Sequence, residues 1–399
     1  MDIKTVVQEH EEYLIHIRRK LHEHPELSGQ EYKTSEFLKA EVKKHNLKIY
    51  EASTTGFIAI LDTGKPGKTV GLRADIDALP IQESEDNLKQ NRKVISENDG
   101  VMHACGHDAH MAMLLTTLKS LVKIKDQLIG KIIFIFEEGE ERWTGINDMI
   151  ETLEPLKLDA IFGMHVLSCL KVGKISVDAG PVMAGGVGAH ITVRGKSGHV
   201  ARPDLAVNPI FTGAHILTNI ASAWANQLDV TETVTLGFTE FNSGDGSNII
   251  PNEAILSGSL RFYNWDEAQK ATALIEKIAT NVGEAHNCET SFTTEHKITA
   301  YPVDNDKNLA EIAQEAIIKN TPEGLATGER WFASESFSCY SELAPTAYAF
   351  VGIKNEEYGS GAEHHNEKFD IDESGLKYGV LAEVQFVVDY LTQDKSEEN

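Results

Sequence analysis

Three histidines, one cysteine and one aspartate occur within eight residues, His103 to His110, which read His-Ala-Cys-Gly-His-Asp-Ala-His. Nitrogen, sulfur and oxygen donors in one short segment suit a divalent metal ion. Cys105 and His107 are separated by Gly106, which permits a sharp turn, so both side chains can reach the same ion. The alternative is a buried thiol beside ordinary histidines, since short Cys/His tracts are common but not unique metal signals.

Two adjacent glutamates, Glu140 and Glu141, follow an apolar run at 131–136. Neighbouring side chains diverge, so one carboxylate can bind a metal ion while the other moves the proton of an activated water, as metal-assisted hydrolysis requires. Acidic runs are more often solvated surface loops. The position directly after a buried strand nevertheless favours a site.

Two further histidines could complete the set of donors. His165 follows an apolar segment at 160–164, although a lone histidine at a strand end more often has a structural role. His365 lies in a polar stretch next to His364, and either of the two could be the ligand. One thiolate, three histidines and a glutamate are enough donors for two ions that share ligands.

Bulk composition narrows the class of protein. A length of 399 residues favours two or three domains. The net charge of −24 argues against nucleic-acid binding, which needs concentrated Lys and Arg. We find no apolar run of about 18 residues and no signal-peptide core at the N-terminus, so we expect no membrane association and a cytoplasmic location. Four scattered cysteines fit a reducing compartment.

The pattern of elements predicts how these residues are positioned. Apolar strands alternate with helices in the first half of the chain and again near its end, which predicts an α/β domain with a doubly wound, mostly parallel sheet and ligands at the strand ends. Expected helices are 4–23, 32–45, a helix containing 111–118, 309–319 and 375–391; expected strands are 48–51, 57–61, 69–72, 131–136, 160–164 and 347–351.

The pattern changes between residues 178 and 295. A glycine-rich turn at 185–188 precedes alternating strands at 190–193, 234–239 and 254–261, with helices at 209–228 and 266–282. Two helices on one antiparallel sheet predict a compact α+β, ferredoxin-like insert. We therefore expect residues 1–177 and 296–399 to form a metal-binding catalytic domain and residues 178–295 to form a separate domain.

Several sequence blocks carry a family resemblance. They are Arg18-Arg19-Lys20-Leu21-His22 with Pro25-Glu26-Leu27 and Glu31, Leu72 to Pro80, Met102 to His110, Gly163 to Val166, Gly198-His199, Asn248 to Pro251 and Gly258 to Arg261. In these blocks the chain resembles the amidohydrolase branch of the aminoacylase and carboxypeptidase superfamily of di-metal peptidases. That branch includes hippurate hydrolase, indole-acetyl-amino-acid hydrolase and N-acetyl-diaminopimelate deacetylase.

The resemblance implies roles for nine residues. The family's five metal ligands match Cys105, His107, Glu141, His165 and His365. Glu140 matches the general base, and His199 matches a histidine that reaches the neighbouring subunit's site and steadies the oxyanion. Asn248 and Arg261 match positions near the substrate carboxylate, for which arginine supplies a planar fork.

The resemblance thus implies a metal-dependent aminoacylase that cleaves the amide bond of N-acyl amino acids or small peptide-like amides. It implies two divalent cations per subunit, Mn(II) or Zn(II) with Co(II) as a further candidate, and a homodimer or dimer of dimers in which residues 178–295 act as lid and dimerisation domain. The chain departs from the family pattern at Glu137-Glu138-Gly139, where relatives usually have Gln-Pro-Ala, and at Asp204, Ser336 and Glu367.

Two other functions remain open from the sequence. Cys105 could be the nucleophile of a cysteine amidase, with His107 or His165 as base. The chain could also be a non-catalytic protein on a hydrolase scaffold that binds an acylated amino acid or a metal ion.

Overall fold

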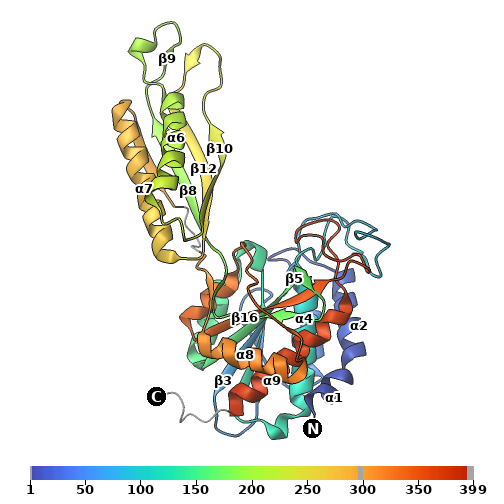
Figure 1. Ribbon diagram of the computed structural model, residues 1–399. Helices are drawn as coiled ribbons and strands as arrows, with labels where there is room; N and C mark the ends of the chain where they lie inside the picture. Colours follow the sequence, from blue (N-terminus) through green and yellow to red (C-terminus); the bar gives the residue numbers. More distant parts are fainter. Residues whose placement is uncertain (1, 295–299, 393–399) are drawn as a thin grey trace. The chain divides into compact units, whose positions relative to one another are not determined.

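The computed structural model describes residues 2–294 and 300–392, and its chain divides into two compact units (Figure 1). The first unit contains residues 1–180, 304–329 and 339–399, and the second contains 181–303 and 330–338. The first boundary thus falls three residues after the expected one at 177. The expected second boundary, at 295, lies outside the described residues. Residues 330–338, which the sequence assigned to the catalytic domain, group with the second unit instead.

A mixed eight-stranded sheet forms the centre of the first unit, in the order β1-β2-β4-β3-β5-β16-β6-β15. The four adjacent central strands of this sheet, β4, β3, β5 and β16, run parallel to one another, whereas β1, β2 and β6 join the sheet through antiparallel pairs. The sequence predicts this mixed α/β arrangement with a mostly parallel sheet. The strands are β1 (Lys48–Glu51), β2 (Phe57–Asp62), β3 (Thr69–Asp75), β4 (Lys131–Glu137), β5 (Ala160–Lys171), β6 (Ile175–Ser176), β15 (Leu325–Ala326) and β16 (Thr346–Lys354).

Helices surround this sheet. They are α1 (Ile3–Gln8), α2 (Glu11–Glu23), α3 (Tyr32–Lys43), α4 (His107–Lys123), α5 (Ile146–Leu153), α8 (Lys307–Asn320) and α9 (Leu376–Thr392), with short 3-10 turns η1 (Lys125–Gln127), η2 (Glu140–Arg142), η3 (Glu154–Leu156) and η6 (Glu373–Gly375). The single helix expected over 4–23 is two helices. The chain breaks at His10, whose buried ring bonds to Ser120 of α4 at 3.0 Å. No helix within residues 2–294 and 300–392 is long and apolar enough to cross a membrane.

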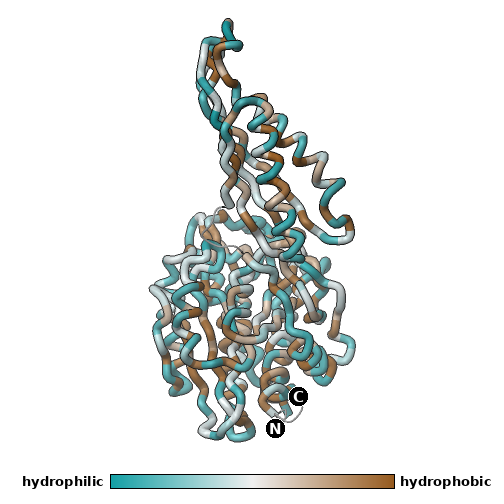
Figure 2. Tube along the Cα trace, turned by 90° about the vertical axis from the view of Figure 1, so that its left-hand side faces the viewer, coloured by the Kyte–Doolittle hydropathy of each residue, from teal (hydrophilic) through white to brown (hydrophobic). Residues whose placement is uncertain are grey.

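Alternation along the central strands gives the sheet two different faces. Val70, Leu72 and Ala74 of β3 join the main apolar core with side chains of α4 and α9. Because successive strand residues point to opposite faces, Asp75 faces the other way, level with Glu137 of β4 and His165 of β5. The polar row lies where β3 and β4 end. Helices of both units alternate between hydrophilic and hydrophobic segments in Figure 2, as amphipathic helices require.

The second unit contains a four-stranded antiparallel sheet in the order β10-β12-β8-β13, with two helices packed against its apolar core. Its elements are β8 (Gly185–Arg194), β9 (Gly198–His199), η4 (Pro203–Leu205), α6 (Pro209–Gln227), β10 (Val234–Asn242), β11 (Ile249–Ile250), β12 (Glu253–Phe262), α7 (Trp265–Ala285) and β13 (Glu289–Thr293). The short strands β9 and β11 pair separately. The elements β7 (Gly180–Met183), β14 (Val303–Asn305) and η5 (Ser336–Glu342) fall at the boundaries between the units.

The glycine-rich turn expected at 185–188 is wrong, because these residues are the first part of strand β8. Gly185 is required by close packing and not by a turn. A β-carbon on Gly185 would lie 2.4 Å from the Phe262 ring and 2.7 Å from the carbonyl oxygen of Ala300. The sequence shows the glycines but not the neighbours that exclude a side chain.

Candidate metal centre

Cys105 and His107 lie where the chain enters α4. Gly106, the residue before the helix, has φ +91°, a conformation that glycine adopts without strain. A β-carbon at Gly106 would also lie 2.3 Å from Val166 Cγ2, so no larger residue fits. This turn places the Cys105 sulfur 3.5 Å from His165 Nε2. Both side chains are buried, as is His107.

Glu140 and Glu141 lie in η2, directly after β4. The chain enters this turn through Gly139, which has φ +62°. Glu140 is buried, and Glu141 Oε1 lies 4.0 Å from His107 Nε2 and 3.1 Å from His365 Nε2. The carboxylates therefore belong to a buried cluster and not to a solvated acidic loop.

His165 lies inside β5, not at its end as expected. The strand continues to Lys171 because it stays paired with β16 beyond the level at which β3 and β4 stop. His165 is nonetheless level with the last residues of those two strands. His165 therefore lies at the expected edge of the sheet, although its own strand continues beyond it.

The adjacent histidines His364 and His365 have different surroundings. His365 has φ +60° and its amide donates to Ala104 O at 2.9 Å, which brings its ring to Glu141. His364 is partly buried, accepts a hydrogen bond from Ser168 N at 3.2 Å, and packs against His165. Burial, with the charges of neighbouring histidines, lowers the pKa of His364 to about 3. The arrangement favours His365 as a ligand.

The described residues contain four groups whose donor atoms lie within 4.8 Å of one another, and three of them consist of predicted site residues: Cys105, His107 and His165; Cys105, Glu141 and His365; and His107, Glu140 and Glu141. Nε2 of His107 and Oε1 of Glu141 are buried and make no hydrogen bond within the described part of the chain; their contacts are ionic, with Asp75 Oδ2 at 3.5 Å and His365 Nε2 at 3.1 Å respectively. Buried polar atoms without a hydrogen bond destabilise the folded chain unless another group, such as a metal ion, occupies the space between them. Two ligands of one ion lie roughly 3–4 Å apart, since each is about 2.0–2.3 Å from it. The residues therefore fit two ions with shared ligands.

Asp77 fixes the orientation of His107. Its carboxylate Oδ1 and its backbone oxygen each lie 3.0 Å from His107 Nδ1, so that nitrogen donates to Asp77 and Nε2 faces the donor cluster. Oδ2 of Asp77 accepts hydrogen bonds from Ser28 Oγ at 2.6 Å and from Glu141 N at 3.0 Å. Burial lowers the pKa of His107, but Asp75 and Asp77 outweigh it and raise that pKa to about 10 in the metal-free chain.

No role for Asp77 was expected from the sequence. Carboxylates in the loop after a buried strand indicate that residues 73–80 lie near the site, but they do not show which carboxylate contacts which ligand. Asp75 also lies near His107, in a buried group with His110. Its carboxylate, however, is bonded to His110 Nδ1 at 2.7 Å and to Arg73 Nη1 at 2.8 Å. Asp75 therefore serves mainly as the counter-ion of these two side chains, and its Oδ2 lies farther, at 3.5 Å, from His107 Nε2.

The acidic departures from the family pattern have partners of their own. Glu137 accepts hydrogen bonds from Arg73 Nε at 2.7 Å and from the Tyr340 hydroxyl at 2.8 Å. Glu138 accepts from Ser53 Oγ at 2.5 Å and from Thr55 N at 2.8 Å. The extra acidic residues are thus held by specific donors and leave the pair Glu140 and Glu141 to the donor cluster.

The three remaining predicted site residues lie in the second unit. His199 in β9 and Asn248 next to β11 are neighbours, because Val200 N donates to Asn248 O at 3.1 Å. Arg261 lies near the opposite end of β12, eight residues from Glu253, which corresponds to about 26 Å along a strand. Within this unit the structure therefore groups His199 with Asn248 and separates both from Arg261.

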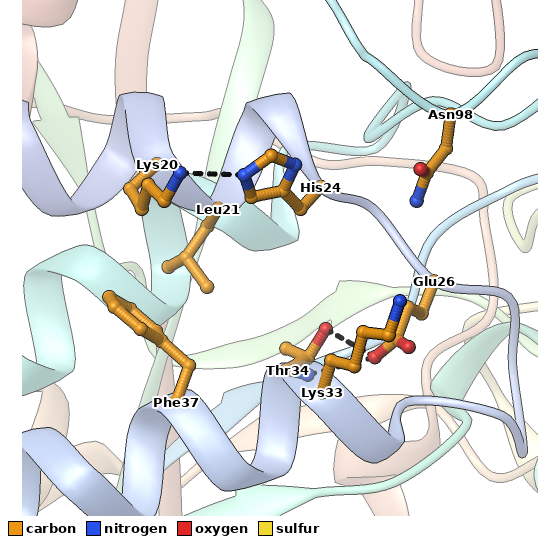
Figure 3. A pocket seen from close by; sticks show the side chains of 8 residues that line it. All are labelled: Lys20, Leu21, His24, Glu26, Lys33, Thr34, Phe37 and Asn98. Atoms are coloured by element: carbon orange, nitrogen blue, oxygen red, sulfur yellow. Dashed lines mark hydrogen bonds between the residues drawn. The ribbon is translucent and has the colours of Figure 1, made fainter.

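A pocket of about 340 Å³ lies elsewhere on the first unit, between the end of α2 and the start of α3 (Figure 3). Lys20 and Lys33 line it together with the apolar side chains of Leu21 and Phe37. None of its lining residues is a predicted ligand, base or substrate residue. The predicted metal ligands and the predicted base lie in the donor cluster and not in this pocket.

An α/β sheet with a buried thiolate, imidazole and carboxylate cluster at its strand ends is the architecture of a metal-dependent hydrolase. Comparison with known proteins identifies the family: the model of peptidase family M20/M25/M40 matches residues 71–388, and the chain belongs to this family. The predicted resemblance to the di-metal amidohydrolases is thereby confirmed. The protein is a metal-dependent hydrolase that acts on amide bonds.

Three similar proteins illustrate the range of the family. Thermostable carboxypeptidase 2 of Saccharolobus solfataricus is 35% identical over 97% of this chain and 98% of its own. An N-acyl-L-amino acid amidohydrolase of Geobacillus stearothermophilus is 36% identical over 73% of this chain and 78% of its own. The crystal structure of Bacillus subtilis YXEP, a dinuclear metal-binding peptidase of the M20 family, matches with a TM-score of 0.84 and 28% identity, covering 96% and 99% of the two chains.

Proposed function

We propose that the protein is an amidohydrolase of N-acyl amino acids that uses two divalent cations. Cys105, His107, Glu141, His165 and His365 would hold the ions. The observation that carries the proposal is the pair of buried, unbonded atoms His107 Nε2 and Glu141 Oε1, which converge with the donors of Cys105 and His365. The amidohydrolase relative supports the substrate class.

Glu140 is the general base in this proposal. When bound, the ions lower the pKa of a water molecule and polarise the amide carbonyl. Glu140 accepts the proton of that water and returns it to the leaving amine. Its burial next to Glu141 and His107 supports this role. Cys105 would be a metal ligand and not a nucleophile, because coordination deprotonates the thiol and occupies its sulfur.

The second unit would recognise the substrate. Arg261 donates to Ser259 Oγ and Leu260 O, and no carboxylate of the described chain pairs with it, so its guanidinium is available for the substrate carboxylate. His199 would stabilise the oxyanion, and Asn248 would lie beside it. Because His199 and Arg261 are far apart within one unit, we propose that the two act on a given site from different subunits of a homodimer or dimer of dimers.

The proposed ligand set limits which metal ions are suitable. A thiolate favours Zn(II), while mixed imidazole and carboxylate ligation also suits Mn(II) or Co(II). We propose Mn(II) or Zn(II), with Co(II) as a further candidate. Metal content of the protein as purified, measured by mass spectrometry, distinguishes these ions.

Amine release from N-acetyl-, N-benzoyl- and longer N-acyl-amino acids tests the function. The panel is run before chelation, after chelation, and after Mn(II) or Zn(II) is added back. We expect turnover that disappears with the chelator and returns with one metal. Chelator-resistant turnover that thiol alkylation abolishes would instead establish a cysteine amidase. Metal binding without turnover on any substrate would establish a binding protein.

A further inference from the structure

Arg92 links two loops of the first unit. It lies in the loop between β3 and α4, and its guanidinium is buried. Nε donates to Ser84 O at 2.7 Å, while Nη1 and Nη2 donate to Phe369 O at 2.6 Å and Glu367 O at 2.7 Å. Ser84 N also donates to Glu367 O at 3.1 Å. One side chain thus holds the backbone of two segments that lie side by side in Figure 1.

The loop that Arg92 holds carries His365. We call residues 363–369 the ligand loop. His365 lies two residues before Glu367 and has a positive φ, which a non-glycine residue keeps only when its surroundings enforce it. The position of its ring near Glu141 therefore depends on how the ligand loop is anchored.

A chain of buried ionic contacts leads from Arg92 to the other ligand segment. Arg92 Nη1 lies 3.2 Å from Glu83 Oε1, which is also 2.8 Å from His22 Nε2. His22 Nδ1 lies 2.8 Å from Asp108 Oδ2, and Asp108 is the residue next to His107. The network therefore connects the start of α4 with the ligand loop, two segments that are more than 250 residues apart in sequence.

Further buried charges contact this network: Arg18 Nε lies 2.9 Å from Asp108 Oδ2, and Asp370 Oδ1 lies 3.8 Å from Arg92 Nη1. Burial and the charge of Arg18 lower the pKa of His22, but Asp108 and Glu83 raise it above its ordinary value. Nε2 of His22 faces Glu83 and Nδ1 faces Asp108, and Arg18 Nη2 also lies 3.2 Å from Nδ1. Removing one member of such a network leaves a buried charge without its partner, so the geometry is strongly determined.

We propose that Arg92 is a positioning residue of the metal centre, which holds the ligand loop so that His365 reaches the ion shared with Cys105 and Glu141. The inference rests on the proposed function, because it takes His365 to be a ligand. Arg92 itself contacts neither substrate nor metal in this proposal. It acts by fixing the backbone from which the ligand projects.

Calorimetric titration of the apo protein with Mn(II) measures metal affinity directly and tests the proposal without using activity. We expect Arg92→Met to weaken binding of one of the two ions by about 10–100-fold and to leave the other unchanged. The donor group of Cys105, His107 and His165 includes no ligand-loop residue, so its ion should not respond. Arg92→Lys keeps a cation beside Glu83, but its single ammonium nitrogen does not span the three carbonyls that Nε, Nη1 and Nη2 of Arg92 reach separately, so it should recover only part of the affinity.

Arg19→Met is the matched control. Arg19 makes a two-pronged ion pair with Glu373, with Nη2 at 2.6 Å and Nε at 2.9 Å from the carboxylate oxygens, outside the ligand loop. We expect this variant to bind both ions with wild-type affinity. Circular dichroism at the titration temperature shows whether each variant is folded. If Arg92→Met is unfolded, Arg92→Lys decides the question.

His365→Ala separates the inference from the proposed function. If His365→Ala binds both ions as tightly as the wild type, the ligand assignment fails, and the role of Arg92 fails with it. If His365→Ala loses one ion while the folded Arg92 variants bind both ions with wild-type affinity, the ligand assignment stands and the positioning role is overturned.

Discussion

At the scale of single residues, the donor cluster depends on side chains that hold its ligands. Asp77 fixes His107 through Nδ1 and the turn of Glu141 through its backbone amide. Cys105, His107 and Glu141 each belong to more than one donor group, and Asp77 positions the last two of them. Residue type and spacing indicated a metal site around residues 103–110, and the family resemblance implied the individual ligands. The role of Asp77 could not be predicted, because it depends on which carboxylate of residues 73–80 faces His107.

Replacement of Asp77 should weaken metal binding. We expect Asp77→Ala to lower metal affinity by about 10–100-fold, since His107 loses the acceptor that orients its ring and raises its basicity. Calorimetric titration of the apo variant measures the change. Asp148→Ala, at an exposed position on α5, is the control and should bind like the wild type. Unchanged affinity in Asp77→Ala would show that His107 is oriented by other contacts.

Replacement of Glu140 should separate chemistry from metal binding. We expect Glu140→Gln to lower kcat by about 10²–10⁴-fold while both ions remain bound, because an amide cannot take the proton of the attacking water. Steady-state kinetics and metal analysis of the same sample measure the two effects. Glu141→Gln, by contrast, should lose metal. Near-normal turnover of fully loaded Glu140→Gln would contradict the general-base role.

At the scale of elements, the central strands could be predicted because buried parallel strands are continuous apolar runs. The expected strands at 131–136 and 160–164 fall within β4 and β5. Predictions failed where tertiary contacts decide. Gly185 suggests a turn in the sequence but lies in β8, since the Phe262 ring excludes a side chain there. The helix expected over 4–23 breaks because His10 turns inward to α4.

Helix α9 shows a further limit of the sequence pattern. Its extent is close to the expected 375–391, but the pattern does not show that Glu383 is buried within it. Burial raises the pKa of Glu383 to about 7, and the neighbouring Thr117 hydroxyl of α4 offsets only part of that rise. The carboxyl is therefore protonated in the folded chain at a pH at which the unfolded chain has lost that proton.

The sign of the pH effect follows from this difference. Between the unfolded pKa of 4.5 and the folded pKa of about 7, the unfolded state binds fewer protons, so stability falls as pH rises through that window and levels off above it. We expect Glu383→Gln to remove this fall and to stabilise the protein at pH 8 by up to about 3 kcal/mol. Thermal unfolding at pH 5 and pH 8 measures it. Glu315→Gln, at an exposed position on α8, should leave the pH profile unchanged.

At the scale of the whole molecule, the chain leaves the first unit after β6 and returns to it near β14. This interruption could be predicted from the change in strand pattern near residue 178. The grouping of residues 330–338 with the second unit could not, since they follow α8 and β15 of the first unit in sequence and join the second unit through long-range bonds, such as Trp331 N to Val182 O at 2.9 Å. Sequence pattern carries little information about such pairings.

The separation of His199 from Arg261 leads to a prediction about assembly. If His199 serves the site of a neighbouring subunit, His199→Ala and Glu140→Gln each inactivate a homodimer, but through different subunits. A mixed dimer then has one site with an intact Glu140 and a partner subunit that supplies an intact His199. Equal mixing with free subunit exchange makes half of the dimers mixed, so about a quarter of wild-type activity should return.

Activity measured after the two variants are unfolded and refolded together, against each refolded alone, tests this complementation. Glu140→Gln mixed with Glu141→Gln is the control, because both defects lie in the first unit and no mixed dimer contains a complete site. No recovery from His199→Ala and Glu140→Gln, with mixed dimers demonstrated by differential tagging, would mean that His199 does not act across a subunit boundary. In that case substrate recognition by the second unit would have to be completed within one chain, despite the distance between His199 and Arg261.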